Sequence, residues 1–479
     1  MSARRSKVKG IKMTTIEVLQ KLEKDTKATY NTEVFITGGF VRDLLRKRRN
    51  NDLDIVVRKM PLDKVFEFLS DFGRTKKVTI NQATEAGAID IILFKAKDDE
   101  LEAQICSPKI LQRGKIVANI NATLKQDSSL RDFTINAMYL SINSMSTKSV
   151  IDFWGGKNDI TSRQLLTVGS AKSRFAQSPI RIMRAFALAS RLNYNIVHHV
   201  KSAILENAYL LKSIHQETIR MELEEILLSP KPSIYLRMMQ KQGVLKIILP
   251  ELNDCVHCVQ DKKYHKFNVF NHLVFTCDNI EPNLTLRLAG LLHDIGKPAS
   301  KQAGDEKISF HKHEVIGARI AAIILKRLCF DNKTIEDVTH LIRMHMYHYT
   351  REYTDAGVRR FITNAGMTPE DIESIENFPL FKLRMAERLG NGFKTKPVTQ
   401  RQKDFEERII RIFKSSTGLT VSELAINGND LMSTFSMKPG KDVGLILNHL
   451  LELVLEDPTL NERSQLLHKT LDFIESRKD

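Results

Sequence analysis

The sequence is poor in cysteine and contains no long hydrophobic run. Its five cysteines are odd in number and scattered through 479 residues, which argues against a disulfide framework and is typical of a reducing compartment. No stretch approaches the roughly 18 consecutive apolar residues of a transmembrane helix. We therefore expect a cytoplasmic protein without a membrane-spanning helix.

Acidic residues are also in short supply. Lys and Arg number 73 against 57 Asp and Glu, which gives a net charge of +16 and favours a polyanionic partner such as RNA, DNA or an acidic membrane surface. No acid precedes Glu17, and this basic start fits an organellar import sequence, a short RNA-contacting arm or a start codon upstream of Met13. The hydrophobic fraction of 42% is large enough for a sizeable core.

One stretch, residues 34–57, combines a strand, a glycine turn, a helix and a second strand. The β-branched run before Gly38 and Gly39 predicts a buried strand, and the apolar spacing after them predicts a helix. A glycine turn at the start of a helix presents free backbone N–H groups, which suits a phosphate. Asp52 and Asp54 are two apart on the second predicted strand and therefore share one face.

Two carboxylates held on one face repel each other unless a cation lies between them. Hard oxygen ligands favour Mg²⁺, and such ions can stabilise both oxygens of an in-line phosphoryl displacement. The pattern predicts nucleotidyl transfer, and the competing interpretation is an ordinary turn with two surface aspartates.

The pattern G-G-x-V-R-D followed by D-x-D resembles the nucleotidyltransferase head of the polymerase beta superfamily, in its CCA-adding tRNA nucleotidyltransferase and poly(A) polymerase branch. The resemblance implies an α+β fold, with a small mixed sheet and helices in the head and a mostly α-helical body behind it. It also implies that Asp52 and Asp54 hold Mg²⁺ and that the nucleotide is bound by Gly38, Gly39, Arg42 and Asp43.

Asp90 is the only charge in an apolar run predicted to be a strand. A buried carboxylate is costly unless it is paired or bound to metal, so Asp90 is a candidate third catalytic carboxylate. An Asp at a strand edge is the alternative. An acidic residue on a comparable strand of the resembling family favours the catalytic interpretation.

The segment from Leu130 to Met138 resembles the family motif R-R-D-F-T-I-N-A-M. The resemblance assigns nucleotide contacts to Arg131, Asp132 and Asn136, with Asp132 near the sugar. Leu130 stands in place of the first arginine of the motif.

A helix expected after Ser178 and Pro179 resembles the E-D-x-x-R element of the family, which recognises the incoming base. By position, the base-recognising residues would be Ser178 and Arg181, supported by Arg184. Gln177 and Ser178 replace the two acids of the motif. A basic helix face that binds tRNA phosphates is the alternative.

Histidines gather in the second half of the sequence. Adjacent His293 and Asp294, in H-D-I-G-K, with His272 upstream, suit a divalent metal held between helices. The stretch resembles the HD-type phosphohydrolase domain, in which Glu387 would stand for the last acidic ligand. His311, His313 and His345 belong to the same constellation, and histidines of an ordinary core are the alternative.

These observations predict a head at 13–157, a helical neck with base recognition at 158–252, an HD domain at 265–390 and a helical tail at 400–479. The expected function is Mg²⁺-dependent addition of CCA to the 3′ end of tRNA from CTP and ATP, with HD phosphohydrolysis as a secondary activity. The alternatives are a poly(A) polymerase, an enzyme that adds only part of CCA, an HD phosphohydrolase with an RNA-binding head, and a non-catalytic RNA-binding protein. The oligomeric state stays open.

Overall fold

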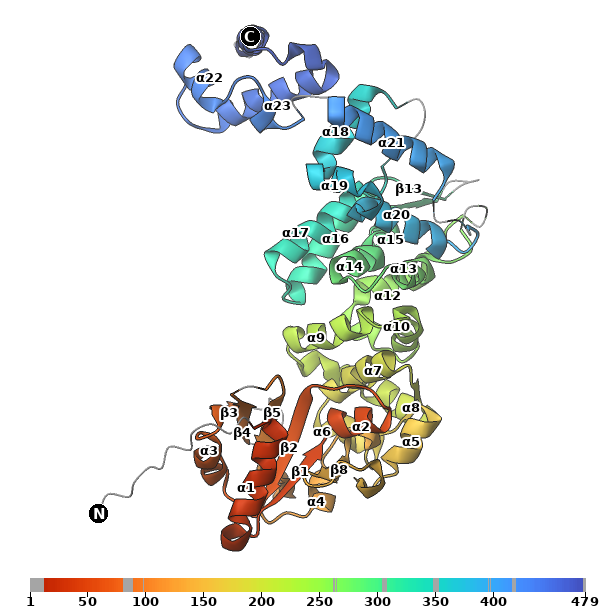
Figure 1. Cartoon of the computed structure of the whole chain (residues 1–479). Helices are drawn as coiled ribbons and strands as arrows, with labels where there is room; N and C mark the ends of the chain where they lie inside the picture. The colour runs from red at the N-terminus through yellow and green to blue at the C-terminus, as the bar shows by residue number, and fades with distance from the viewer. Residues whose placement is uncertain are drawn as a thin grey trace, which may run out of the picture. The chain divides into compact units, whose positions relative to one another are not determined.

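The computed structural model describes residues 13–80, 89–97, 99–261, 263, 265–303, 308–347, 353–394, 396, 398–415 and 419–476 (Figure 1). The chain forms two compact units. The first comprises Met1–Pro230 and Ile234–Pro250, and the second comprises Lys231–Ser233 and Glu251–Asp479. The predicted head and neck therefore lie almost entirely in the first unit, and the predicted HD and tail ranges lie in the second.

A seven-stranded mixed sheet forms the centre of the head, with the strand order β3-β4-β5-β2-β1-β8-β9. Its strands are β1 (Glu33–Thr37), β2 (Asp52–Arg58), β3 (Gly73–Ile80), β4 (Ile89–Ala96), β5 (Glu102–Cys106), β8 (Met138–Ser141) and β9 (Ile151–Asp152). Neighbouring strands are antiparallel except for β2 and β5, which are parallel. The remaining elements are α1 (Thr15–Tyr30), α2 (Gly39–Leu45), α3 (Leu62–Leu69), α4 (Leu124–Ser128) and the hairpin β6 (Lys109–Gln112) and β7 (Lys115–Ala118).

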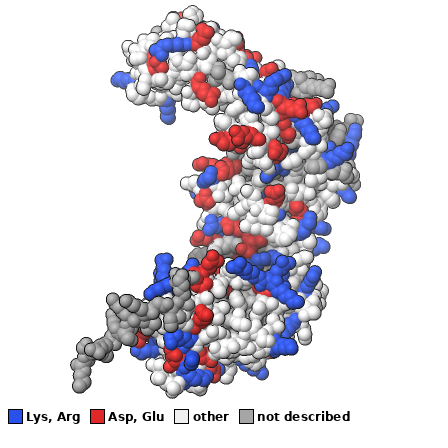
Figure 2. All heavy atoms as spheres, in the orientation of Figure 1, with Lys and Arg blue, Asp and Glu red and all other residues white. Residues whose placement is uncertain are grey.

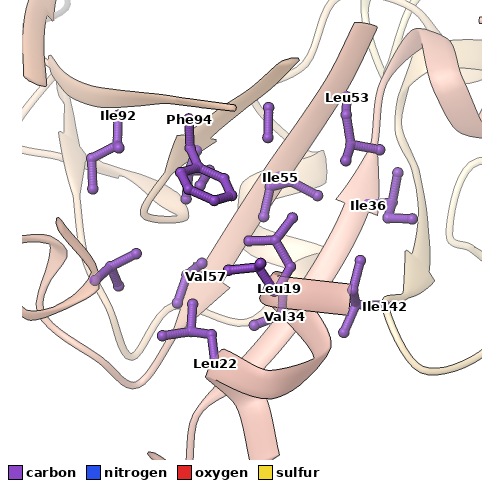
Figure 3. Packing of buried hydrophobic residues seen from close by; sticks show 14 of the residues in the cluster. Leu19, Leu22, Val34, Ile36, Leu53, Ile55, Val57, Ile92, Phe94 and Ile142 are labelled. Carbon is purple, nitrogen blue, oxygen red and sulfur yellow. The ribbon is translucent and has the colours of Figure 1, made fainter. Parts of the chain in front are cut away.

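One face of the sheet packs against α1 and α3 to form the hydrophobic core of the head (Figure 3). Leu19 of α1 shares this core with Leu53 and Ile55 of β2, and all three are fully buried. Successive side chains of a strand point to opposite faces. Asp52 and Asp54 therefore lie on the face that α1 and α3 leave uncovered.

The first unit continues as helices, which are α5 (Gly156–Ser162), α6 (Ala171–Gln177), α7 (Ile180–Leu192), α8 (His198–Asn207), α9 (Gln216–Leu227), α10 (Pro232–Lys241) and α11 (Leu245–Ile248). Ion pairs join α7 to α9, since Arg184 lies 3.3 Å from Glu222 and Arg191 lies 3.6 Å from Glu225.

The described part of the second unit is helical apart from the hairpin β12 (Lys301–Ala303) and β13 (Ile308–Phe310). Its longer helices are α13 (Val269–Asp278), α14 (Leu284–Leu292), α16 (His313–Arg327), α17 (Asn332–Met344), α18 (Asp355–Ala365), α20 (Pro379–Gly390), α21 (Gln400–Ser415), α22 (Gly428–Phe435), α23 (Lys441–Glu456) and α24 (Arg463–Glu475). No helix within the described ranges is both long and apolar enough to cross a membrane. A mixed-sheet head with a mostly helical body confirms the predicted fold class.

Candidate functional site

A tight turn brings the backbone of the head against one carboxylate. β1 ends at Thr37, which pairs with Asp54 of β2, and Gly38 follows with a φ of 70° before α2 begins at Gly39. A Cβ atom at Gly38 would lie 2.3 Å from Oδ2 of Asp54. Only glycine leaves room for this approach and tolerates this backbone conformation.

The two carboxylates of β2 differ in their surroundings. Asp52 is exposed, whereas Asp54 is partly buried, and this burial raises the pKa of Asp54. The charge of Arg131 opposes the increase, and the charge of Asp52 adds to it. Burial and the neighbouring charge of Asp52 both disfavour the ionised form of Asp54. A cation between the two carboxylates would offset both effects, because it replaces the lost hydration and cancels the repulsion. The pair therefore fits a divalent ion that prefers oxygen ligands, such as Mg²⁺.

A cavity of about 700 Å³ opens beside these carboxylates. It is lined by Gly39, Arg42, Asp43, Arg46, Arg48, Arg49, Asn50, Asn51, Asp52, Asp54, Asn136, Arg191 and Leu192. Five arginines around one cavity suit an anion that carries several charges, such as a triphosphate. Arg46, Arg48 and Arg49 were not predicted from the sequence, although a basic run directly before D-x-D was a usable signal. Elsewhere on the visible face, basic and acidic side chains are interspersed (Figure 2).

Asp43 fixes the arginines at the wall of this cavity. Arg42 donates to both carboxylate oxygens of Asp43, at 3.0 and 2.6 Å, and to Oδ1 of Asn136 at 2.8 Å. Arg46 and Asn50 also donate to Asp43, at 3.0 and 2.8 Å. Burial opposes ionisation of Asp43, but these donors outweigh it and lower the pKa of the carboxyl. Asp43 thus fixes the position of the Arg42 guanidinium.

We expect Asp43→Asn to raise the KM for nucleoside triphosphate by about tenfold with a smaller effect on kcat. Loss of the charge weakens the four hydrogen bonds that Arg42, Arg46 and Asn50 donate to the carboxylate, and a hydrogen bond to a charged group is worth about 1.5–3 kcal/mol. Steady-state kinetics of nucleotide incorporation measure both constants. Asp63→Asn is the matched control, since Asp63 is an exposed aspartate of the same head that pairs only with Lys77 among the described ion pairs. Equal KM values in the two variants would contradict the positioning role.

Arg131 does not line this cavity. Its guanidinium contacts Asp127 at 3.3 Å and donates to the hydroxyl of Tyr139 at 3.1 Å, while that hydroxyl donates to Asp127 at 2.5 Å. Its charge opposes the increase that burial causes in the pKa of Asp54. The structure therefore gives Arg131 an indirect influence on the carboxylate pair.

A second cavity of about 300 Å³ shares Asn136 and Arg191 with the first. It is lined by Asp132, Phe133, Asn136, Arg184, Ala187, Leu188, Arg191, Glu222 and Glu225. Arg184 lies 3.8 Å from Asp132 and 3.3 Å from Glu222. Burial raises the pKa of Glu222, and the charge of Arg184 opposes that increase. Hydrogen-bond donors on arginines and acceptors on carboxylates thus line a cavity next to the one that five arginines line.

Ser178 and Arg181 do not line this second cavity. Ser178 ends α6 in an extended conformation. The guanidinium of Arg181 donates to the carbonyl oxygens of Leu130 and Arg174, at 2.8 and 3.4 Å. The carbonyl of Leu130 lies in a loop, and that of Arg174 lies near the end of α6, where it also accepts from the amide of Ser178. The residues of α7 that face the cavity are one to three turns further along, and only Arg184 among them was predicted.

Asp90 does not join Asp52 and Asp54, so the predicted third carboxylate is wrong. In the sheet register Asp54 is level with Gln104 of β5 and Leu93 of β4, and Asp90 is three residues further along β4. That separation is about 10 Å along the strand and about 10 Å across it. Asp90 accepts a 2.7 Å hydrogen bond from Thr79 and lies 3.4 Å from Lys77, so these neighbours satisfy its charge.

The second unit contains a buried cluster around Asp294. His272 of α13 and His293 at the end of α14 place their Nε2 atoms 3.7 and 3.5 Å from Oδ2 of Asp294. Burial lowers the pKa of His293 to about 3, so the imidazole is neutral at pH 7 and can serve as a ligand. Lys297 also contacts Oδ2, at 2.6 Å.

Glu387 of α20 lies outside the group of ligand atoms formed by His272, His293 and Asp294, and Arg384 donates to its carboxylate at 2.9 Å. Its charge still acts on His272 and His293. Together with Lys263, His265, Asn391, Phe393 and Lys394 it lines a cavity of about 320 Å³. His265 of this cavity lies 5.9 Å from His272 between ring centroids. The cavity thus adjoins the cluster, and Glu387 is a wall residue of the cavity.

Glycines explain how the helices approach so closely here. A Cβ atom at Gly296, in the H-D-I-G-K motif, would lie 2.2 Å from the carbonyl oxygen of His313 and 2.6 Å from the amide nitrogen of Gly317. Glycine at this position lets the start of α16 contact the turn that carries Asp294. The motif thereby brings His313 to the cluster.

Three family models match the chain. They are the poly A polymerase head domain at residues 34–166, the probable RNA and SrmB-binding site of polymerase A at 193–256, and the putative tRNA nucleotidyltransferase domain 2 at 316–470. A carboxylate pair beside a cation-lined cavity lies within the first match. Residues 34–166 therefore match the poly A polymerase head domain, and the predicted enzyme class, a nucleotidyltransferase, is confirmed.

Whole proteins of this kind are similar along most of their length. The CCA-adding enzyme of Lactococcus lactis subsp. lactis (strain IL1403) is 25% identical over 438 residues, which are 91% of this chain and 92% of that protein. The A-adding tRNA nucleotidyltransferase of Deinococcus radiodurans is 27% identical over 347 residues, which are 69% and 75% of the two chains. The Bacillus stearothermophilus CCA-adding enzyme in complex with CTP shares the fold, with a TM-score of 0.64, 20% identity and coverage of 97% and 98%.

Proposed function

We propose that this enzyme adds C, C and A to the 3′ end of tRNA, using CTP and ATP. The observation that carries the proposal is the Asp52 and Asp54 pair beside a cavity with five arginines, next to a second cavity of mixed polarity. CCA-adding relatives and the fold shared with CCA-adding enzymes in complexes with CTP, ATP and tRNA support it.

Asp52 and Asp54 would hold Mg²⁺, which when bound neutralises charge that develops on the transferred phosphate. The arginines around the first cavity bind and orient the triphosphate, and Gly38 keeps Asp54 against the turn. The 3′-hydroxyl oxygen of the RNA bonds to the α-phosphorus, the bond to pyrophosphate breaks, and the hydroxyl proton is lost. Most of the contribution of the protein is orientation and charge stabilisation.

The second cavity would receive the base of the incoming nucleotide. Arg184 supplies donors and Glu222 supplies acceptors there, and each is held by the other at 3.3 Å. Asp132 lies in the same cavity, with one oxygen accepting from the amide of Phe133 and the other facing Arg184, which suits a contact with the sugar or base edge. Base selection therefore depends on α7 and α9 together.

Glu222→Gln is expected to change the ratio of CTP to ATP use by about tenfold. Loss of one charged acceptor in a half-buried site removes roughly 1.5 kcal/mol from the base that uses it. Competition between the two triphosphates on tRNA ending in C and on tRNA lacking CCA measures the ratio. Glu217→Gln on the same helix is the control, because its side chain is 68% exposed and pairs with Arg220. An unchanged ratio in the Glu222 variant would place base selection elsewhere.

The proposed function is tested with tRNA transcripts that end before CCA, after CC and after CCA. Purified protein and Mg²⁺ are supplied with each triphosphate alone and with CTP plus ATP, and products are measured at single-nucleotide resolution. Addition of C, C and A followed by termination is the expected result. Addition of A only to transcripts ending in CC would assign the specificity of the Deinococcus relative, and runs of A would assign a poly(A) polymerase.

A second activity, hydrolysis of phosphate esters, is favoured by the buried histidine cluster of the second unit. His272, His293 and Asp294 would hold a divalent metal, since two neutral imidazoles and a carboxylate are ligands typical of such ions. In the reaction a water oxygen bonds to phosphorus, the ester P–O bond breaks and the leaving oxygen takes a proton. Phosphate release from a panel of phosphate esters, compared between wild type and Asp294→Asn, tests the activity.

A further inference from the structure

Arg191 borders both cavities of the first unit. It lies in the last turn of α7 and lines the cavity beside Asp52 and Asp54 as well as the second cavity. One nitrogen of its guanidinium lies 3.6 Å from a carboxylate oxygen of Glu225 on α9, and the two side chains are 54% and 51% exposed. Arg191 can therefore act on a ligand in either cavity.

The contact between Arg191 and Glu225 is weak. At 3.6 Å the two groups attract each other by charge but are too far apart for a hydrogen bond. Arg42, by contrast, donates three hydrogen bonds at the wall of the first cavity. A half-exposed ion pair contributes little to stability, whereas a triphosphate carries several negative charges that attract a guanidinium. A triphosphate in the first cavity can therefore take Arg191 from Glu225.

This exchange would change the charge of the second cavity. The ionisable residues at its wall are three acids and two arginines, namely Asp132, Glu222, Glu225, Arg184 and Arg191. Arg184 lies between Asp132 and Glu222, at 3.8 and 3.3 Å. Arg191 is the one partner of Glu225 among the ion pairs of the described residues. Once Arg191 turns to a triphosphate, the carboxylate of Glu225 lacks a counterion.

A carboxylate without a counterion distinguishes the four bases by their exocyclic groups. An ionised carboxylate only accepts hydrogen bonds. Cytosine and adenine carry an amino group that donates, whereas uracil and guanine carry a carbonyl oxygen that accepts at the corresponding position. Such a carboxylate at the wall of the base cavity therefore favours C and A, and it repels U and G.

We propose that the triphosphate draws Arg191 away from Glu225, and that the released carboxylate of Glu225 then selects bases that carry an amino group. The inference rests on the proposed function for the placement of triphosphate and base, and it adds a specificity-determining residue on α9. Binding of the triphosphate and selection of the base become linked through one ion pair.

Glu225→Gln tests the selection of the base. The amide keeps the size of the side chain but can also donate, so it accommodates the carbonyl oxygen of uracil or guanine. The preferences for CTP over UTP and for ATP over GTP, each a ratio of kcat/KM for addition of one nucleotide, are expected to fall by about tenfold. Using both pairs makes the test independent of which nucleotides of CCA the enzyme adds.

Glu206→Gln is the matched control for this variant. Glu206 of α8 is also about half exposed, at 54%, and it pairs with Lys172 of α6 in an ion pair between helices that lines neither cavity. The control is expected to keep both preferences. Unchanged preferences in Glu225→Gln would overturn the role of Glu225 alone, whereas a wild-type protein that adds no nucleotide would contradict the proposed function and this inference with it.

Inorganic triphosphate, which has no base, tests the exchange of Arg191 separately. Its inhibition of nucleotide addition is measured at a fixed concentration of free Mg²⁺. Arg191→Gln is expected to weaken the inhibition by about tenfold, because one cation is lost. Glu225→Gln is expected to strengthen it by about threefold, because the carboxylate no longer competes for the guanidinium.

The opposite directions of these two shifts distinguish the exchange from a merely structural ion pair. If the pair only held α7 against α9, both variants would loosen the same contact and would shift the inhibition in the same direction. Shifts in the same direction, or no shift in Arg191→Gln, would overturn the exchange. Thermal unfolding of each variant checks that it folds.

Discussion

Replacing Asp54 with asparagine is expected to lower the rate of nucleotide addition by about 10³-fold. The variant keeps the size of the side chain but removes the charge that would hold Mg²⁺ beside the α-phosphate, and the loss of about 4 kcal/mol of transition-state stabilisation corresponds to that factor. Single-turnover incorporation of CMP into tRNA that lacks CCA measures the rate. Binding of the tRNA, measured separately, should be nearly unchanged.

Asp90→Asn is the matched control for this variant. Asp90 is an aspartate of the same sheet, but Thr79 and Lys77 satisfy it at the far end of β4. We expect this variant to keep its rate of addition within about twofold, as for surface substitutions outside a site. Full activity in Asp54→Asn, or a comparable loss in Asp90→Asn, would show that the carboxylates are assigned wrongly.

Gly38→Ala should lower both the stability of the head and its activity. A Cβ atom here would lie 2.3 Å from Oδ2 of Asp54, and the backbone has a φ of 70° and a ψ of −141°, a conformation that only glycine adopts readily. The free energy of unfolding is expected to fall by about 1–3 kcal/mol. Because the carboxylate must move, the rate of addition is expected to fall by about 10²-fold.

Gly155→Ala separates the effect of the contact from the effect of backbone conformation. Gly155 also has a positive φ, 79°, but a Cβ atom added there would meet no other atom within 4 Å. We expect a loss of about 1–2 kcal/mol in unfolding free energy and little change in activity. Chemical denaturation and nucleotide incorporation, measured on both variants, distinguish the two effects. An equal loss of activity in both would refute the role of the Gly38 contact.

The sequence was most informative where function depends on residues close together in the chain. The turn at Gly38, the helix after it and the two carboxylates of β2 all lie within 34–57, and local periodicity was enough to predict their arrangement. Asp90 was predicted wrongly because its position depends on the register of β4 against β5, and no local pattern encodes that register.

Long-range packing also determines the second cavity of the head and the histidine cluster. Arg181 matched the family motif in position, yet its guanidinium turns to the carbonyl of Leu130, 51 residues away in sequence. His313 and His345 stood out as histidines, but their relation to the two oxygens of Asp294 depends on how α16 and α17 pack. The sequence identified His313 and His345 as candidates, but it did not predict which oxygen of Asp294 they would face.

The hydrogen bonds between Arg42 and Asp43 have a thermodynamic consequence for the binding of a ligand in this cavity. An arginine that rotates freely in water loses roughly 2 kcal/mol of rotamer entropy when a ligand immobilises it. Arg42 is only 3% exposed and three hydrogen bonds already hold its guanidinium, so folding has ordered it before any nucleotide arrives. Under the proposed function, the contact of Arg42 with a triphosphate therefore carries little entropic penalty, whereas the exposed Arg48 and Arg49 would still have to be ordered.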